Sequence, residues 1–487
     1  MQPPLPELKF GVATADHQSE AYEPGRDDVR DEWERSQKQT ERGLATDFWH
    51  RYPEDIALAA QLGCKLFRFS IAWSRVEPKP GEYDQSVLDH YKKVVATIRE
   101  AGLQPLITLH HFTWPLHVRE RGGMTAQDFP AWFGAYARVV VTALGTGVPY
   151  WVTFNEPNLL VYGYVKPWWQ KEFAMPPGLS PETEHTDQFE SAARLMRNLF
   201  KAHTFARRAI RHLDSAAKVG TNPFVLGMPS LLQWGLNQQA IRTTNRERMR
   251  QQQNSLVHQN SLASACSDLK HRRHPLSRFS LFRRLAPVFG FIEHSLRSLA
   301  VLSAISNSDW WALGMAGQLP SYLCPDYCHG QQDFVGFDYY WGINTFELHR
   351  ISQLLDASMS KFSNAPVEPS GLLVALRRFH RLFPDKEILI VENGCIEAAD
   401  GYKRHEYIDA HVSKILMARR EGIPVTAYFC WSITSNREWG LPFSPESDFG
   451  LYHIDLDSDP QLARKPTKSA EIYADIIREN TPGQPPA

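Results

Sequence analysis

The chain has 487 residues, of which 43% are hydrophobic and 22% charged, and its formal net charge is -1. This composition indicates a soluble globular protein with a large buried core, and the balanced charge gives no reason to expect nucleic acid as a partner. Six irregularly spaced cysteines exclude a disulfide framework. The N-terminal segment lacks a basic stretch followed by an apolar one, and no apolar run reaches the length of about 18 residues that a spanning helix needs. We expect a cytoplasmic protein without a signal peptide.

Short runs rich in β-branched and aromatic residues recur along the whole chain. They predict eight strands: Phe10–Ala13, Leu66–Ser70, Pro105–Leu109, Tyr150–Phe154, Val219–Asn222, Phe334–Tyr339, Ile388–Val391 and Thr426–Trp431. Between them lie segments of helical periodicity, among them 53–63, 86–102, 129–145 and 405–422. Each of these four segments ends on glycine, which is a common end of a helix.

The alternation of strands and helices predicts an α/β fold with a parallel sheet, and eight such units predict a closed (β/α)8 barrel of the TIM type. An open doubly wound sheet is the alternative, but no glycine-rich phosphate loop follows the first strand. We therefore predict that residues 1–487 form a single catalytic barrel domain.

The segment 241–305 interrupts this pattern between the fifth and sixth strands. Its part from Ile241 to Arg284 holds about ten Lys and Arg but only two acids, and bulky apolar residues follow. One interpretation is an elaborated connection, packed on the barrel or acting as a lid. The other is a membrane contact through 275–305, because basic and bulky apolar residues together suit an interface. We favour the first.

Two glutamates stand at the ends of predicted strands. Glu156 follows the fourth strand and Glu392 follows the seventh, and each has an Asn beside it. Side chains at the carboxyl ends of barrel strands face one common rim, so these two are expected to meet. A single glutamate at a strand end is most often a surface charge. Two carboxylates that face each other are the minimal equipment for breaking a glycosidic bond.

The motifs around these glutamates carry a resemblance to a known family. "TFNEPN" and "IVENG" resemble the two signature motifs of glycoside hydrolase family 1, the β-glucosidase family of retaining (β/α)8 enzymes. Further similar stretches, in the family's order, are "FGVATADHQSE", "DFWHRYPEDIALAAQLGCKLFRFSIAWSRVEP", "LITLHHF", "FVGFDYYWG" and "AYFCWSITSNREW". The resemblance runs from about Phe10 to Ile477, apart from the basic segment.

The resemblance implies a role for each residue of the catalytic set. Glu156 is expected to be the general acid/base and Glu392 the nucleophile. Arg68 matches the family arginine that keeps the nucleophile ionised, and Tyr340 matches the tyrosine that reaches it. Asn155 matches the asparagine that binds the 2-hydroxyl of the sugar.

The resemblance also implies a set that binds the terminal sugar. Gln18, His111 and Glu438 match the polar residues of this set, and Trp431 and Trp439 match its indoles. A lone histidine such as His111 is more often a core residue, but its place directly after the third strand favours the sugar. Phospho-glycosidases of the family usually carry a serine where Glu438 stands, so we expect unphosphorylated glycosides.

Several residues depart from the family pattern and leave the exact sugar open. Asp338 stands where Asn is usual, beside the expected site. The other departures are His17, Ser435, Arg437 and Asp448. The leaving group is expected to meet Trp168 and Trp169 and the segment 241–305, in loops that vary most.

We expect a retaining β-glucosidase that hydrolyses terminal non-reducing β-D-glucosyl residues of a small-molecule β-glycoside. The alternative is a transglycosylase that uses the same glutamates on a hydrophobic or lipid aglycone. A glycan-binding barrel without activity is a third reading, but both glutamates are present. Cys324, Cys328 and His329 are a weak metal motif because the spacing lacks a second half. We therefore expect neither metal nor cofactor.

Overall fold

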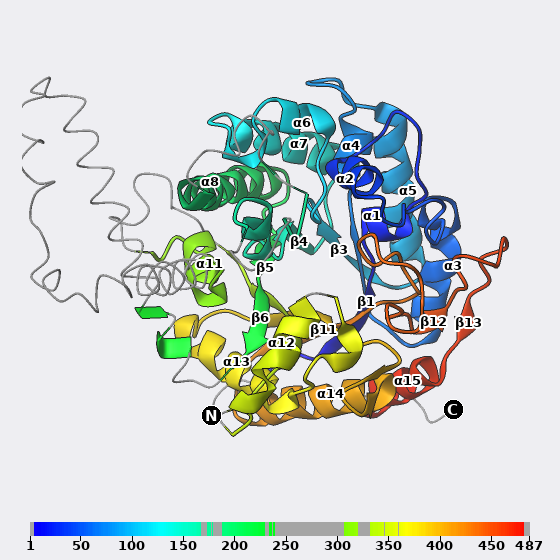
Figure 1. Ribbon diagram of the computed structural model, residues 1–487, viewed down its shortest axis with the longest axis vertical. Coiled ribbons are helices and arrows are strands. Elements are labelled where there is room, and N and C mark those ends of the chain that lie inside the picture. The colour runs from blue at the N-terminus through cyan, green and yellow to red at the C-terminus, as the bar shows by residue number, and fades with distance from the viewer. Residues whose placement is uncertain are drawn as a thin grey trace, which may run out of the picture.

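The strands of the main sheet run parallel and form a ring that is surrounded by helices (Figure 1). The computed structural model describes residues 4–166, 173–176, 178, 188–228, 233–235, 237–238, 306–319, 332–344, 346–358 and 360–481. The strands of the ring are β1 (Lys9–Ala13), β2 (Leu66–Ser70), β3 (Gln104–Thr108), β4 (Tyr150–Asn155), β5 (Lys218–Asn222), β6 (Phe224–Gly227), β7 (Val335–Gly342), β8 (Ile388–Asn393) and β11 (Val425–Trp431). Every predicted strand is confirmed, with ends that shift by at most three residues.

Helices follow the strands around the outside of the ring. The main ones are α3 (Phe48–Gln61), α5 (Gln85–Glu100), α7 (Phe129–Leu144), α8 (Gln188–Leu213), α11 (Ser308–Met315), α13 (Pro369–Leu382), α14 (Arg404–Arg420) and α15 (Lys468–Asn480). The four predicted helices correspond to α3, α5, α7 and α14. Gly63 follows α3 and Gly422 follows α14 with positive φ angles of 86° and 87°, the left-handed backbone that favours glycine after a helix.

Short elements fill the connections between these units. They are α1 (Asp16–Ser19), α2 (Val29–Gln37), α4 (Trp73–Val76), α6 (Leu116–Glu120), η1 (Gly123–Thr125), η2 (Leu159–Gly163), η6 (Leu348–Arg350), α12 (Ile351–Ser358), η7 (Phe362–Asn364), β9 (Ala398–Ala399), β10 (Tyr402–Lys403), β12 (Tyr452–His453) and β13 (Lys465–Pro466). Of these, α1 and α2 contribute side chains to the site described below.

The ring closes at the fifth strand, which Pro223 divides into β5 and β6. β5 pairs with β4 and β6 pairs with β7, so neighbouring parts of one strand hold the two ends of the sheet together. Proline has no N–H to give to a strand ladder. The next N–H, that of Phe224, donates to the Asn158 side chain at 2.8 Å. The sheet is thus a closed (β/α)8 barrel with its fifth strand in two parts.

The strands are buried on both faces, as parallel strands between a barrel core and outer helices are expected to be. Every residue of β2, β4, β8 and β11 is buried. Most are apolar, but Arg68 in β2 and Glu392 in β8 are charged. A buried charge is stable only when it is paired and hydrogen-bonded. Arg68 and Glu392 therefore indicate a candidate functional site inside the barrel.

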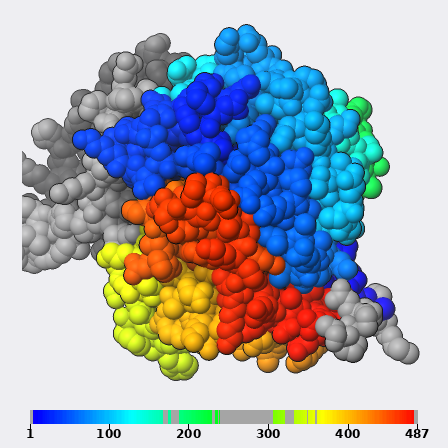
Figure 2. All heavy atoms as spheres, turned by 90° about the vertical axis from the view of Figure 1, so that its right-hand side faces the viewer, coloured from blue at the N-terminus to red at the C-terminus, as the bar shows by residue number. Residues whose placement is uncertain are grey.

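Segments from the two ends of the chain lie side by side (Figure 2). The Tyr473 hydroxyl of α15 donates to the Gly11 carbonyl oxygen of β1 at 2.7 Å, and the Tyr473 ring packs against those of Phe10 and Tyr428. β1 itself pairs with β2 on one side and β11 on the other. The last helix therefore covers the point where the first strand meets the last.

The segment 241–305 lies outside the described residues. It belongs to the connection between β6 and β7, which are parts of the fifth and sixth strands of the barrel. Among the helices that the structure describes, none has both the length and the apolar character needed to cross a bilayer.

Candidate active site

Strands β4, β7 and β8 bring three acidic side chains together. Glu156 directly follows β4, Asp338 lies in β7 and Glu392 lies in β8. All three residues are buried, and one oxygen of each carboxyl group lies within 4.8 Å of the others. The expected meeting of Glu156 and Glu392 is therefore present. Asp338 makes a third acid in the same place.

Both carboxylate oxygens of Glu392 are held by partners. Arg68 Nη1 forms an ion pair with Oε1, and the Tyr340 hydroxyl donates to Oε2 at 2.6 Å. Arg68 is itself oriented by Nε, which donates to the Thr108 hydroxyl at 3.0 Å. Charge-assisted bonds of this kind fix a carboxylate in place and favour its ionised form. Glu392 is thus held at both carboxylate oxygens at the centre of the rim.

A chain of hydrogen bonds runs from Arg68 to Asp338 in a fixed direction. Arg68 Nη2 donates to Asn155 Oδ1 at 2.6 Å, and Asn222 Nδ2 donates both to this Oδ1 at 2.6 Å and to Asp338 Oδ2 at 2.5 Å. A guanidinium has donors only, so the atom of Asn155 facing it must be oxygen. The atom of Asn222 facing that oxygen must then be nitrogen. Neither amide can be turned around without losing bonds.

The electrostatics of the rim differ between its acids. Burial, followed by the charge of Glu392, raises the pKa of Glu156 well above its usual value, against the opposing charge of Arg68. Burial and the charges of Glu392 and Glu156 likewise raise the pKa of Asp338, which Arg68 and the bond from Asn222 oppose. Glu156 therefore holds its proton to higher pH than an ordinary glutamate does, as a group that donates a proton must.

The backbone at Glu156 is unusual. Its φ angle is 38°, in the left-handed region that residues with a Cβ avoid. Its N–H donates to the Asn222 carbonyl oxygen at 3.0 Å, and its own carbonyl oxygen accepts from the Leu159 N–H at 2.9 Å. Such strain persists only where the surrounding structure imposes it, and it gathers at functional sites.

The two residues after Glu392 explain the rest of the "VENG" motif. Asn393 Nδ2 donates to the Tyr339 carbonyl oxygen at 2.5 Å, and the Tyr428 hydroxyl donates to Asn393 Oδ1 at 2.9 Å. At Gly394 a Cβ atom would lie 2.0 Å from the Trp431 carbonyl oxygen. The motif is therefore a turn that is hydrogen-bonded to both β7 and β11 and passes closely beside the end of β11.

The polar residues expected to bind sugar lie at the same rim. Gln18 Nε2 of α1 donates to Glu438 Oε2 at 2.9 Å. Burial and the charge of Glu392 raise the pKa of Glu438 to about 8, although Arg30 and Gln18 oppose the rise. Gln18 Oε1 is buried without a hydrogen-bond partner among the described residues. The pair thus keeps an acceptor free for a further donor.

The aromatic residues of the expected sugar set surround His111. Its ring lies parallel to those of Trp431 and Trp439, with centroids 5.8 and 5.9 Å away. Burial lowers the pKa of His111 well below its usual value, and the positive charge of nearby Arg68 lowers it further. His111 is therefore neutral, and its Nδ1 has no partner among the described residues. A neutral imidazole can both donate to and accept from hydroxyl groups.

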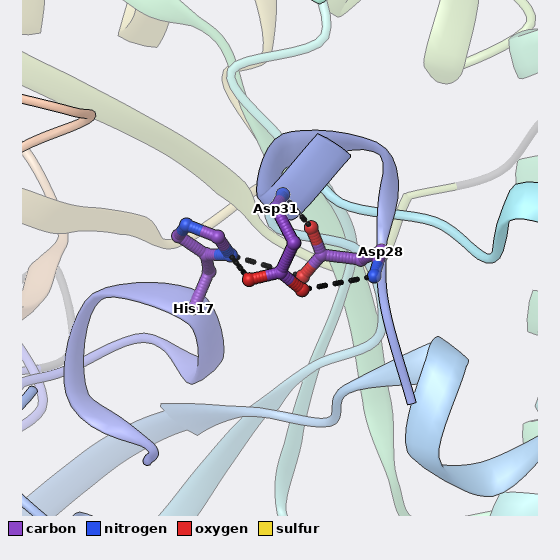
Figure 3. Close-up of side chains that lie close together, drawn as sticks. All are labelled: His17, Asp28 and Asp31. Atoms are coloured by element: carbon purple, nitrogen blue, oxygen red, sulfur yellow. Dashed lines mark hydrogen bonds and ion pairs between the residues drawn. The ribbon is translucent and has the colours of Figure 1, made fainter. Parts of the chain in front are cut away.

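Figure 3 shows a buried charged cluster formed by His17 of α1 and by Asp28 and Asp31 at the start of α2. His17 Nδ1 lies 3.0 Å from Asp28 Oδ2, and Arg42 pairs with Asp31 at 2.7 Å. Burial alone would lower the pKa of His17, but the charge of Asp28 and bonds to Asp28 and Glu34 raise it to about 9. The cluster also helps to position Trp439, because the His17 ring lies parallel to the Trp439 ring with centroids 6.0 Å apart.

The remaining departures from the family pattern hold the segment after β11 in place. Ser435 Oγ accepts from the Ile454 N–H at 2.9 Å, and Arg437 Nη2 pairs with Asp457 at 2.6 Å. Asp448 Oδ2 lies 2.8 Å from His453 Nδ1. These three residues support the loop that carries Glu438 and Trp439. The predicted Trp168, Trp169, Cys324, Cys328 and His329 lie outside the described residues.

Metal binding is a poor fit to the clusters that the described residues form. The two groups with suitable spacing are Glu156, Asp338 and Glu392, and His17, Asp28 and Asp31. Each already faces a fixed cation, Arg68 in the first and Arg42 in the second. A metal ion would have to displace a buried guanidinium, so we assign no ligand role here.

Three residues that orient the site were not predicted from the sequence. Asn222 orients Asn155 and Asp338, Thr108 orients Arg68, and Asn158 ties the loop after β4 to β6 through bonds to Phe224. A signal for Asn222 was available. Asn222 ends β5 as Asn155 ends β4. Because the carboxyl ends of neighbouring barrel strands lie at the same rim, both side chains are expected there.

The chain is similar to known proteins over most of its length. The model of glycosyl hydrolase family 1 matches residues 5–246 and 328–482. Beta-glucosidase A of Thermotoga maritima is 24% identical over 460 residues, covering 90% of this chain and 87% of the relative. Beta-glucosidase A of Acetivibrio thermocellus is 26% identical over 444 residues, covering 90% and 88%.

Solved structures share the fold. The family 1 β-glucosidase structure from Thermotoga maritima covers 98% of this chain and 99% of its own, with a TM-score of 0.68 and 22% identity. The crystal structure of an enzyme from Alicyclobacillus herbarius covers 98% and 99%, with a TM-score of 0.69. Because the family model covers most of the chain and the curated relatives match across nearly all of it, the chain belongs to glycosyl hydrolase family 1 and is a glycoside hydrolase.

Proposed function

We propose that the protein is a retaining β-glucosidase in which Glu392 is the nucleophile and Glu156 the general acid/base. The observation that carries this proposal is the closeness of the two carboxyl groups, with oxygens within 4.8 Å. Retaining glycosidases hold their carboxyl groups about 5–5.5 Å apart, whereas inverting ones leave room for a water between them. The curated relatives named β-glucosidase support the β-glucoside specificity.

The reaction proceeds by double displacement. Glu392 attacks the anomeric carbon and forms a glycosyl-enzyme, while protonated Glu156 gives its proton to the leaving oxygen. Arg68 and Tyr340, which hold Glu392, keep it ionised and aimed before the attack. Glu156 then takes a proton from the water that attacks the glycosyl-enzyme. Its raised pKa suits the first step, and loss of the Glu392 charge lowers that pKa for the second.

The sugar lies against the indoles with its hydroxyls toward Gln18, Glu438 and His111. Asn155 binds the 2-hydroxyl through Nδ2, which has no partner among the described residues. Glu438 stands where phospho-glycosidases of the family usually carry a serine, which supports an unphosphorylated sugar. The substrate is therefore an unphosphorylated β-glycoside.

The test is the release of nitrophenol from β-linked nitrophenyl glycosides. Glu392→Ala and Glu156→Ala are expected to lose activity by at least about a thousandfold and a hundredfold, respectively, because each removes a reacting group. Azide should partly restore Glu156→Ala. Glu387→Ala is the matched control, since Glu387 precedes β8 and pairs with Lys218.

The stereochemistry of the first product is measured by proton NMR in the same assay. A β-anomer supports the retaining assignment, and an α-anomer would exclude it. Activity on none of the glycosides, with the protein folded, would refute the β-glucosidase proposal altogether.

Transfer to an acceptor alcohol remains the second candidate function. Two exposed aromatic residues, Trp234 and Phe346, follow β6 and β7, whose carboxyl ends face the rim. Phe346 is 94% exposed, and such side chains suit a hydrophobic aglycone or acceptor. Product analysis with added alcohols separates the functions, because only a transglycosylase gives mostly transfer product. The cytoplasmic location and the single-domain organisation stay predictions.

A further inference from the structure

Asp338 creates a charge problem that the described reaction does not solve. Three buried carboxyl groups, those of Glu156, Asp338 and Glu392, face one guanidinium, that of Arg68. If Glu392 is ionised and Glu156 protonated, Arg68 cancels one negative charge. An ionised Asp338 would then leave a net negative charge without a cation in a buried site, which is strongly unfavourable. A proton on Asp338 brings the sum to zero.

The hydrogen bonds determine where such a proton sits. Asn222 Nδ2 donates to Asp338 Oδ2, and its direction is fixed by Asn155 and Arg68. Oδ2 is therefore an acceptor, so the proton belongs on Oδ1. This atom is buried and has no hydrogen-bond partner among the described residues.

We propose that Asp338 is a third acid of the active site, which carries a proton in the resting enzyme and gives it up before Glu156 does as the pH rises. This inference rests on the proposed function of Glu156 and Glu392. It assigns to Asp338 a positioning role, since the residue acts by keeping Glu156 protonated and takes no part in bond making.

The surroundings of the two acids decide which one ionises first. Asp338 accepts a bond from Asn222 that favours its ionised form, whereas no described side chain donates to the Glu156 carboxyl group. The charged and titratable groups facing Asp338 are Glu392 on β8, Glu156 after β4, Arg68 on β2 and Tyr340 on β7. The charges of Glu392 and Arg68 cancel. The hydrogen bond from Asn222 therefore makes Asp338 the first of the two acids to lose its proton.

The consequence is a wider range of activity toward alkaline pH. Once Asp338 is ionised, its charge makes the loss of the Glu156 proton harder still, because the two groups titrate as a coupled pair. The form with Glu156 protonated therefore persists to higher pH than it would beside an uncharged amide. At acidic pH Asp338 is already neutral and has no such effect.

The experiment measures kcat/KM against pH for the wild type and Asp338→Asn. The amide has the size of the neutral acid and cannot ionise. The alkaline limb should move down by about one pH unit or more, and the acid limb should stay in place. Asp333→Asn, two residues before β7 and paired with Arg207, is the control and should move neither limb.

Two results would overturn the proposal. If both limbs move to lower pH, Asp338 is ionised throughout and acts on Glu392 as well. If neither moves, Asp338 does not titrate in the working range.

An infrared measurement covers the case in which Asp338→Asn does not fold. In Glu156→Gln with Glu438→Gln, a carbonyl band of a protonated carboxyl group should disappear at alkaline pH. The same background with Asp338→Ala should lack this band, which distinguishes it from the bands of other buried acids such as Glu20. Absence of a titrating band refutes the proposal. This measurement needs no catalysis, so it also separates failure of the inference from failure of the proposed glycosidase function.

Discussion

Arg68 shows how one buried side chain can serve two networks at once. One arm of its guanidinium holds Glu392, and the other fixes the direction of the Asn155 amide. Lysine would supply the same charge but only as a point, without the planar fork that reaches both partners. The orientation of the Asn155 amide, which we propose binds the sugar, thus depends on a residue that need not touch substrate.

His17 provides a prediction about pH and stability at the same scale. Its pKa is about 9 in the folded protein against an ordinary 6.5. The stabilisation from its charge is complete below pH 6.5 and is lost as the pH rises through 9. His17→Gln should therefore lower the free energy of unfolding by about 3 kcal/mol at pH 6, and the difference should shrink by pH 10.

Urea unfolding of both proteins across this range measures the difference. The relevant neighbours are Asp28, Asp31, Glu34 and Arg42, all of which are kept in the variant. His50→Gln is a suitable control, since that histidine is exposed. A difference that does not change with pH would mean that His17 stabilises by packing alone.

Among the elements, the turn after β8 carries the sharpest constraint. A Cβ on Gly394 would collide with the Trp431 carbonyl oxygen, which is backbone and cannot move aside. Gly394→Ala is expected to push β8 and β11 apart and reduce kcat/KM by at least about tenfold through displacement of Glu392. Steady-state kinetics with a circular dichroism check of folding measure this effect.

Gly401→Ala is the comparison for that variant. A Cβ there meets nothing within 4 Å, although the residue has a positive φ angle. It should cost stability without reducing activity at low temperature. Equal losses of activity in both variants would contradict the proposed effect on Glu392.

The sequence was sufficient to locate elements wherever periodicity was strong. All eight strands were predicted, because buried parallel strands are continuous apolar runs. The division of the fifth strand was not, since a proline in a strand signals an edge or a break but not which neighbour each part will join. That choice depends on Asn158, whose side chain takes the N–H that follows Pro223.

For the whole molecule, the contact of α15 with β1 ties the chain ends into one unit. Tyr473→Ala is expected to lower the free energy of unfolding by about 3–5 kcal/mol, and Tyr473→Phe by about 1 kcal/mol through loss of the bond to Gly11. Urea titration followed by two probes should give one coincident transition for each protein. Two separate transitions would contradict the single-domain hypothesis.

The site as a whole was less accessible from the sequence than its central glutamates. Glu156 and Glu392 stand out because an acid after an apolar strand is rare. The cluster of His17, Asp28 and Asp31 could not be foreseen, because α1 and α2 are short and nothing local indicates how they fold against each other. The charge balance around Asp338 likewise required the distances between side chains from different strands.

The left-handed backbone of Glu156 has a consequence for selection experiments. A residue with a Cβ in that region is disfavoured by about 1–2 kcal/mol, and glycine relieves the cost. A screen that rewards heat resistance alone would therefore tend to enrich glycine at this position and remove the proposed general acid/base in doing so. Any programme to make this enzyme more robust has to select for turnover together with stability.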